Sequence, residues 1–121
     1  IFPQAADNNR GPWRELESYG RDLVYQQGKA LYVISGAYGD KGRVGRVTVP
    51  GRVWKVIVVL DSPEDKVNRR TEVIAVDMPN SDRIEPNWEL YRTTVDRIEI
   101  ATGYDLLSEV PENVQAAIES R

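Results

Sequence analysis

The 121-residue sequence contains neither cysteine nor histidine, and each absence excludes a kind of chemistry. Without cysteine there is no disulfide framework, no thiolate metal site and no cysteine nucleophile within these residues. Without histidine there is no Ser-His or Cys-His catalysis inside the chain, and a zinc site would need an all-oxygen ligand set that zinc rarely adopts. No apolar run approaches the ~20 residues of a membrane-spanning helix, so we expect no membrane partner.

Positive charge is also in short supply, because 16 basic residues stand against 19 acidic ones and the net charge is -3. That balance alone argues against a nucleic-acid-binding surface over the whole molecule. The charges are unevenly distributed, with nine basic and five acidic residues in 1–60 but seven and fourteen in 61–121. We therefore expect any polyanion to bind the first half, with chance clustering as the alternative.

The densest set of polar side chains lies near a predicted helix over residues 8–27. Asp7, Asn8 and Asn9 are N-cap residue types, Pro12 suits a first turn, and Gly28 is a typical residue for ending a helix. The predicted buried face has helical spacing: Trp13, Leu16, Gly20, Leu23 and Val24.

A second stripe of the same helix repeats every four residues, at Asn9, Trp13, Glu17 and Arg21. This spacing places an amide, a carboxylate and a guanidinium on roughly one side. The alternative is structural: Asn9 caps the helix, and Glu17 with Arg21 forms an exposed pair contributing about 0.2–0.5 kcal/mol.

The remaining chain predicts an α+β fold. Strands are predicted over 30–35, 52–60 and 71–78, and the continuously apolar run 56–60 indicates that both faces of that strand are covered. The Gly-rich segment 36–45 lacks Walker spacing and predicts a hairpin connection, with a mobile basic loop as the alternative.

The ends of the chain carry further signals. Residues 1–6 have the pattern of a strand tail entering a loop. A short helical turn is predicted near 88–91, followed by a helix over 95–102 that Thr94 caps and Gly103 stops, and a last helix that begins at Pro111. Trp13, Trp54 and Trp88 are expected in the core.

These features together resemble the DNA/RNA non-specific endonucleases, which have a ββα-metal active site. The first matching residues are Pro3-Gln4, Asn9-Arg10, Trp13, Leu16-Glu17 and Arg21. The later matches are Val49-Pro50, the run from Trp54 to Asp61, Met78-Pro79-Asn80, the run from Thr94 to Glu99, and Thr102-Gly103-Tyr104-Asp105. The resemblance implies an antiparallel sheet flanked by helices and hydrolysis of DNA and RNA without sequence or sugar preference.

The resemblance also implies roles for individual residues. Asn9 would be the direct protein ligand of one Mg²⁺ or Mn²⁺, Glu17 would hold metal-bound water, and Arg21 would contact the scissile phosphate. A hard cation that keeps several waters, and a planar guanidinium that binds phosphate, make this physically reasonable.

Three further residues are weaker candidates. Gln4 matches a family position at the edge of the site. Arg10 and Arg14 are candidate contacts to the nucleic-acid backbone, and their alternative role is to keep the helix surface soluble.

The sequence departs from the family in one respect, because the family's base is a histidine in an Asp-Arg-Gly-His motif. We therefore expect residues 1–121 to be the C-terminal portion of a single nuclease domain, whose sheet an N-terminal segment carrying that histidine completes. Like the secreted bacterial members, the protein is expected to be secreted or periplasmic. The alternatives are a non-catalytic nucleic-acid-binding or interaction module and a simple structural domain.

Overall fold

The apolar run predicted as a buried strand is the central strand β4 (Arg52–Leu60) in the computed structural model, which describes residues 4–121 apart from the side chain of Val44. Successive side chains point to opposite faces of a strand. Val53 and Ile57 accordingly belong to one buried hydrophobic cluster, and Val56 and Val58 belong to a second one. This confirms that both faces of the strand are covered.

Four antiparallel strands form the main sheet in the order β1 (Ala30–Tyr38), β4, β5 (Glu72–Pro79) and β6 (Arg92–Thr93). Strand β1 extends three residues beyond the predicted 30–35, and β6 was not predicted. The Gly-rich segment and the residues after it form a two-stranded ribbon, β2 (Gly42–Val44) with β3 (Val47–Val49), which confirms the predicted hairpin connection.

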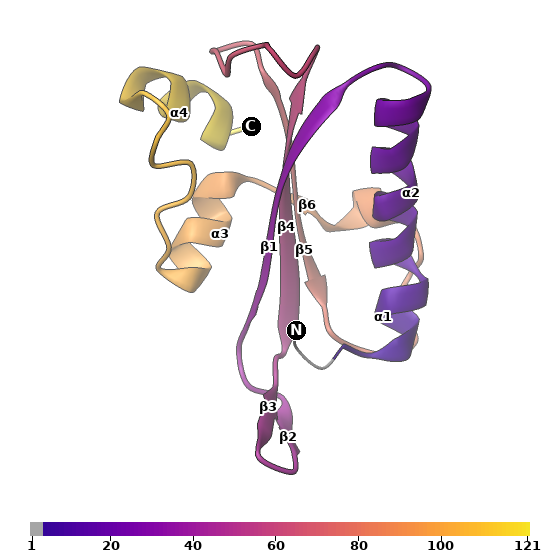
Figure 1. Cartoon of the computed structure of the whole chain (residues 1–121). Helices are drawn as coiled ribbons and strands as arrows, with labels where there is room; N and C mark the ends of the chain where they lie inside the picture. The colour runs from indigo at the N-terminus through magenta and orange to yellow at the C-terminus, as the bar shows by residue number, and fades with distance from the viewer. Residues whose placement is uncertain (1–3) are drawn as a thin grey trace.

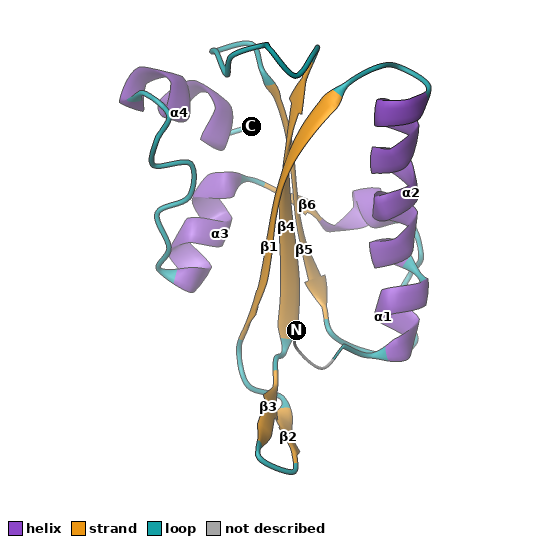
Figure 2. Cartoon of the chain, in the orientation of Figure 1, coloured by secondary structure: helices purple, strands orange, loops and turns teal. Residues whose placement is uncertain are grey.

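The sheet lies between two helical layers (Figure 1). Helices α1 (Ala6–Arg10) and α2 (Pro12–Tyr25) cover one face, together with the 3₁₀-helix η1 (Trp88–Tyr91). Helices α3 (Val95–Thr102) and α4 (Glu112–Glu119) cover the other face, as the colouring by secondary structure makes plain (Figure 2). The α+β fold class, with an antiparallel sheet flanked by helices, is confirmed. No helix within residues 4–121 is both long enough and apolar enough to cross a bilayer.

The predicted single helix over 8–27 is wrong, because the chain breaks at Gly11 into α1 and α2. Gly11 has φ -96° and ψ -113°, outside the helical region. Proline disfavours the helical conformation in the residue before it, so Pro12 explains the break. A side chain could not replace glycine here, since a Cβ on Gly11 would lie 2.6 Å from the carbonyl oxygen of Asp7. Helix α2 then ends at Tyr25, two residues earlier than predicted, and Gly28 follows with φ 69°.

The predicted N-caps at Asp7, Asn8 and Asn9 are also wrong. All three residues lie inside α1, and the cap positions belong to Ala5 and Gly11, which have no side chain able to accept. Residues 1–3 lie outside the described residues, and positions 4–6 hold no strand, so the predicted strand tail is not found in the described part.

The C-terminal helices confirm the capping signals. Thr94 Oγ1 accepts from the backbone N–H of Arg97, and Gly103 has φ 79° at the end of α3. Pro111 is the N-cap of α4 rather than its first residue. The three tryptophans are buried as predicted.

Candidate active site

Helix α1 is attached to the end of β5 by polar side chains. Asn8 is fully buried, and its Nδ2 donates to the carbonyl oxygen of Pro79 at 2.7 Å. The backbone N–H of Ala5 donates to Asn80 Oδ1 at 2.6 Å, and Asp7 Oδ2 accepts from the backbone N–H of Arg83 at 2.7 Å. The segment Met78-Pro79-Asn80 therefore has a structural role that its sequence did not reveal.

These contacts give the two adjacent asparagines, Asn8 and Asn9, different roles. Gln4 Nε2 donates to Asn8 Oδ1, so both of these amides belong to the packing of α1 against the sheet. Asn9 is exposed, and within residues 4–121 its side chain makes no hydrogen bond. Of the two asparagines, Asn9 is therefore the one with an amide oxygen available to a ligand, and Gln4 holds Asn8 in place.

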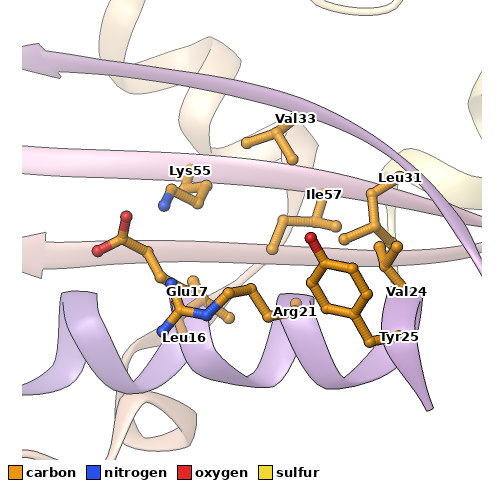
Figure 3. A pocket seen from close by; sticks show the side chains of 10 residues that line it. Leu16, Glu17, Arg21, Val24, Tyr25, Leu31, Val33, Lys55 and Ile57 are labelled. Carbon is orange, nitrogen blue, oxygen red and sulfur yellow. The ribbon is translucent and has the colours of Figure 1, made fainter.

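An open pocket of about 360 Å³ lies between α2 and the sheet (Figure 3). Glu17 and Arg21 extend from α2 into it, and Lys55 reaches it from β4. The other lining residues are mostly apolar: Leu16, Gly20, Val24, Tyr25, Leu31, Val33 and Ile57. The structure thus brings two of the predicted site residues together in one cavity.

Glu17 and Arg21 do not form the ion pair that would give them a purely structural role. Arg21 Nη2 donates to Ser18 Oγ at 3.1 Å, one turn back along α2. Within residues 4–121 the two ion pairs are Lys29–Asp61 and Arg52–Asp77. The carboxylate of Glu17 and most of the Arg21 guanidinium are therefore free to bind a ligand.

Lys55 is the site residue that the sequence analysis missed. It is 7 % exposed, and its Nζ lies 4.2 Å from the ring centroid of Trp13, a cation–π arrangement. Burial lowers the pKa of Lys55 below its usual range, and the nearby charge of Glu17 acts in the opposite direction. A buried lysine without an ion-pair partner is rare, which makes it a functional candidate. The signal in the sequence was a charged residue inside an otherwise apolar strand.

The remaining candidates lie outside the pocket. Arg10 and Arg14 are exposed, and neither lines the cavity. Arg10 Nε is 3.5 Å from the carbonyl oxygen of Ala6, a local contact on its own helix. Val24 was predicted to be buried but is 39 % exposed at the edge of the pocket.

Comparison with known proteins identifies the family, and the fold agrees with it. The chain belongs to the DNA/RNA non-specific endonuclease family, whose model matches residues 1–113. It is 46 % identical to a nuclease of Nostoc sp. (strain PCC 7120) over 126 aligned positions and 30 % identical to a nuclease of Serratia marcescens over 131. Both alignments cover 100 % of this chain and 46 % of the relative, so the chain spans about half the length of the curated relatives it matches.

Proposed function

We propose that residues 1–121 supply the metal-binding helices of a Mg²⁺- or Mn²⁺-dependent endonuclease that hydrolyses phosphodiester bonds in DNA and RNA. The observation that carries the proposal is the pocket on α2, where Glu17 and Arg21 lie unpaired beside the buried Lys55. Family membership supports the same reaction class.

The side chains present fit a hard divalent cation. Asn9 offers an exposed amide oxygen with no hydrogen bond within residues 4–121, and Mg²⁺ accepts such ligands while keeping several waters. When bound, the cation would stabilise negative charge on the phosphate and the leaving oxygen. Glu17 would accept hydrogen bonds from water, and Arg21 would hold a phosphate oxygen through its planar fork. Arg10 and Arg14 would contact the nucleic-acid backbone further along.

The proposal assigns the base to another segment, since this chain has no histidine. Residues 1–121 would then be the C-terminal portion of one nuclease domain, and a histidine-bearing N-terminal segment would complete its sheet. Strand β1 supports this arrangement, because within the described residues it pairs with β4 alone. Tyr32 and Val33 on β1 are 67 % and 51 % exposed, so they leave apolar surface for another strand.

The experiment compares cleavage of plasmid DNA and of RNA by this chain alone and by a protein that also contains the histidine-bearing segment. We expect Mg²⁺-dependent cleavage that a chelator abolishes, in the second protein and not in the first. Cleavage of neither substrate by the second protein, with binding retained, would favour the alternative of a non-catalytic nucleic-acid-binding module.

Substituting Asn9 tests the ligand assignment. Asn9→Ala in the active protein should lower turnover by about 10²-fold or more, because the cation loses its direct protein ligand. The midpoint of urea unfolding should barely change, since the Asn9 side chain is exposed and makes no hydrogen bond within residues 4–121. Asn8→Ala is the matched control and should destabilise the fold, since Asn8 is buried and bonded to Pro79. Near-normal turnover in Asn9→Ala would refute the assignment.

A further inference from the structure

Helices α3 and α4 lie on the face of the sheet opposite α2 (Figure 1). They bring three carboxylates together. Asp96 and Glu99 come from α3, and Glu119 comes from the last turn of α4. One carboxylate oxygen from each residue lies within 4.8 Å of the others. At this separation the three carboxyl groups cannot all be ionised at little cost unless a cation lies between them, and without one a carboxyl group retains a proton.

Glu119 makes this cluster different from an ordinary acidic surface. It is 3 % exposed, and its Oε2 is buried without a hydrogen-bond partner among residues 4–121. Burial raises the pKa of Glu119 to about 8, and a hydrogen bond to the Glu99 side chain and the charges of Glu99, Asp96 and Asp105 act in the same direction. Leaving a buried carboxylate oxygen without a partner is energetically costly, so such atoms are usually bound by a water molecule, an ion or another polar group.

Protein cations do not neutralise the cluster. The two ion pairs found within residues 4–121 involve Lys29 with Asp61 and Arg52 with Asp77, and neither includes a member of the cluster. Glu99 Oε2 accepts from the backbone N–H of Leu106 at 2.8 Å, which fixes that carboxylate and leaves its other oxygen available.

We propose that Asp96, Glu99 and Glu119 bind one divalent cation of the calcium type, which ties α3 to α4. Calcium takes oxygen ligands at about 2.3–2.6 Å, so two oxygens bound to one ion lie at most ~5 Å apart, and three carboxylate oxygens within 4.8 Å of one another meet that condition. Magnesium demands near-ideal octahedral geometry at about 2.0–2.1 Å and gives up its water reluctantly, so a cluster of protein carboxylates favours calcium. Water would fill the remaining positions. The site is separate from the pocket on α2 and does not depend on the proposed nuclease activity.

The test is the melting temperature of the chelator-treated chain in increasing CaCl₂, with NaCl of equal ionic strength as the reference and MgCl₂ in parallel. We expect the melting temperature to rise and saturate with an apparent Kd of about 0.1–1 mM, the range of few-ligand calcium sites. Magnesium should need at least a tenfold higher concentration than calcium to raise the melting temperature by the same amount. No rise beyond that in NaCl would overturn the proposal.

Four variants locate the binding. Glu119→Gln should abolish the calcium-dependent rise, and Glu112→Gln, an exposed charge change on the same helix, should keep it. Asp96→Asn changes an exposed residue, so it should fold and raise the apparent Kd about tenfold or more. Asn9→Ala should keep the full rise. An unchanged rise in both Glu119→Gln and Asp96→Asn, or its loss in Asn9→Ala, would refute the assignment.

Discussion

Replacing Lys55 with methionine tests whether the buried ammonium serves the pocket or the fold. Methionine has a similar length and no charge, so the substitution keeps most of the volume between β4 and α2 and removes only the cation. The loss of the contact with Trp13, whose ring centroid is 4.2 Å from Nζ, should cost about 0.5–2 kcal/mol. Removing a largely buried charge that has no ion-pair partner should stabilise the fold by more than this loss, since burying such a charge costs several kcal/mol.

The net expectation is a gain of about 1 kcal/mol in the free energy of unfolding, or ~5 °C in melting temperature for a chain of this size. The gain should depend on pH. Burial lowers the pKa of Lys55 below 10.5, so the unfolded state binds its proton more tightly than the folded state does. Wild-type stability should therefore rise with pH as Lys55 deprotonates, up to pH 10.5, and the advantage of Lys55→Met should shrink over the same window.

Urea titrations at pH 7 and pH 10, with cleavage assays on the active protein, measure both effects. We expect turnover to fall about 10–100-fold while stability rises, because Lys55 places positive charge beside Glu17 in the pocket. Lys29→Met is the matched control, a more exposed lysine paired with Asp61 at 2.7 Å, and should change stability little. A Lys55→Met protein with lower stability and unchanged turnover would refute this reasoning, because the lysine would then be structural.

Two further substitutions test the packing of β1. Gly36→Ala should destabilise the fold by about 1–3 kcal/mol, because the new Cβ would lie 2.7 Å from Cζ2 of the buried Trp54. Gly51→Ala serves as its control in urea titrations, because the nearest atom to a Cβ there, the backbone nitrogen of Asp40, is 4.0 Å away. Tyr38→Phe should cost about 1 kcal/mol at neutral pH by removing the 2.5 Å hydrogen bond to Asp77 Oδ2. Burial and then Asp77 raise the pKa of Tyr38 to about 12, so wild-type stability should fall between pH 10 and pH 12, and this fall should be smaller in Tyr38→Phe.

The elements that the sequence predicted well are those whose limits are encoded locally. Helix α3 has the predicted bounds because Thr94 supplies the cap and Gly103 the left-handed residue that ends it. Strand β4 has the predicted bounds because its apolar run ends at charged residues on either side. Strand β1 was predicted too short, since the suitability of Gly36 for a strand depends on Trp54 of the neighbouring strand.

The candidate site was predicted in part, and its errors share a cause. Glu17 and Arg21 lie on one helix, so helical spacing was enough to place them on the same side. Lys55 is 38 positions from Glu17 in the sequence and meets it only through the packing of β4 against α2. The roles of Asn8 and Gln4 in anchoring α1 also depend on a distant partner, the carbonyl oxygen of Pro79.

The proposed binding of nucleic acid by an acidic protein depends on how its charges are distributed between the two faces of the sheet. Arg21 and Lys55 line the pocket on the α2 face, whereas the cluster of Asp96, Glu99 and Glu119 lies beyond the sheet on the α3 face. Packed layers lie ~10 Å apart, and the Debye length is about 8 Å at physiological ionic strength. The distance from the α3 face to the α2 face therefore weakens the repulsion between the acidic cluster and a phosphate backbone that approaches α2. Binding should follow the local charge of that face rather than the net charge of -3.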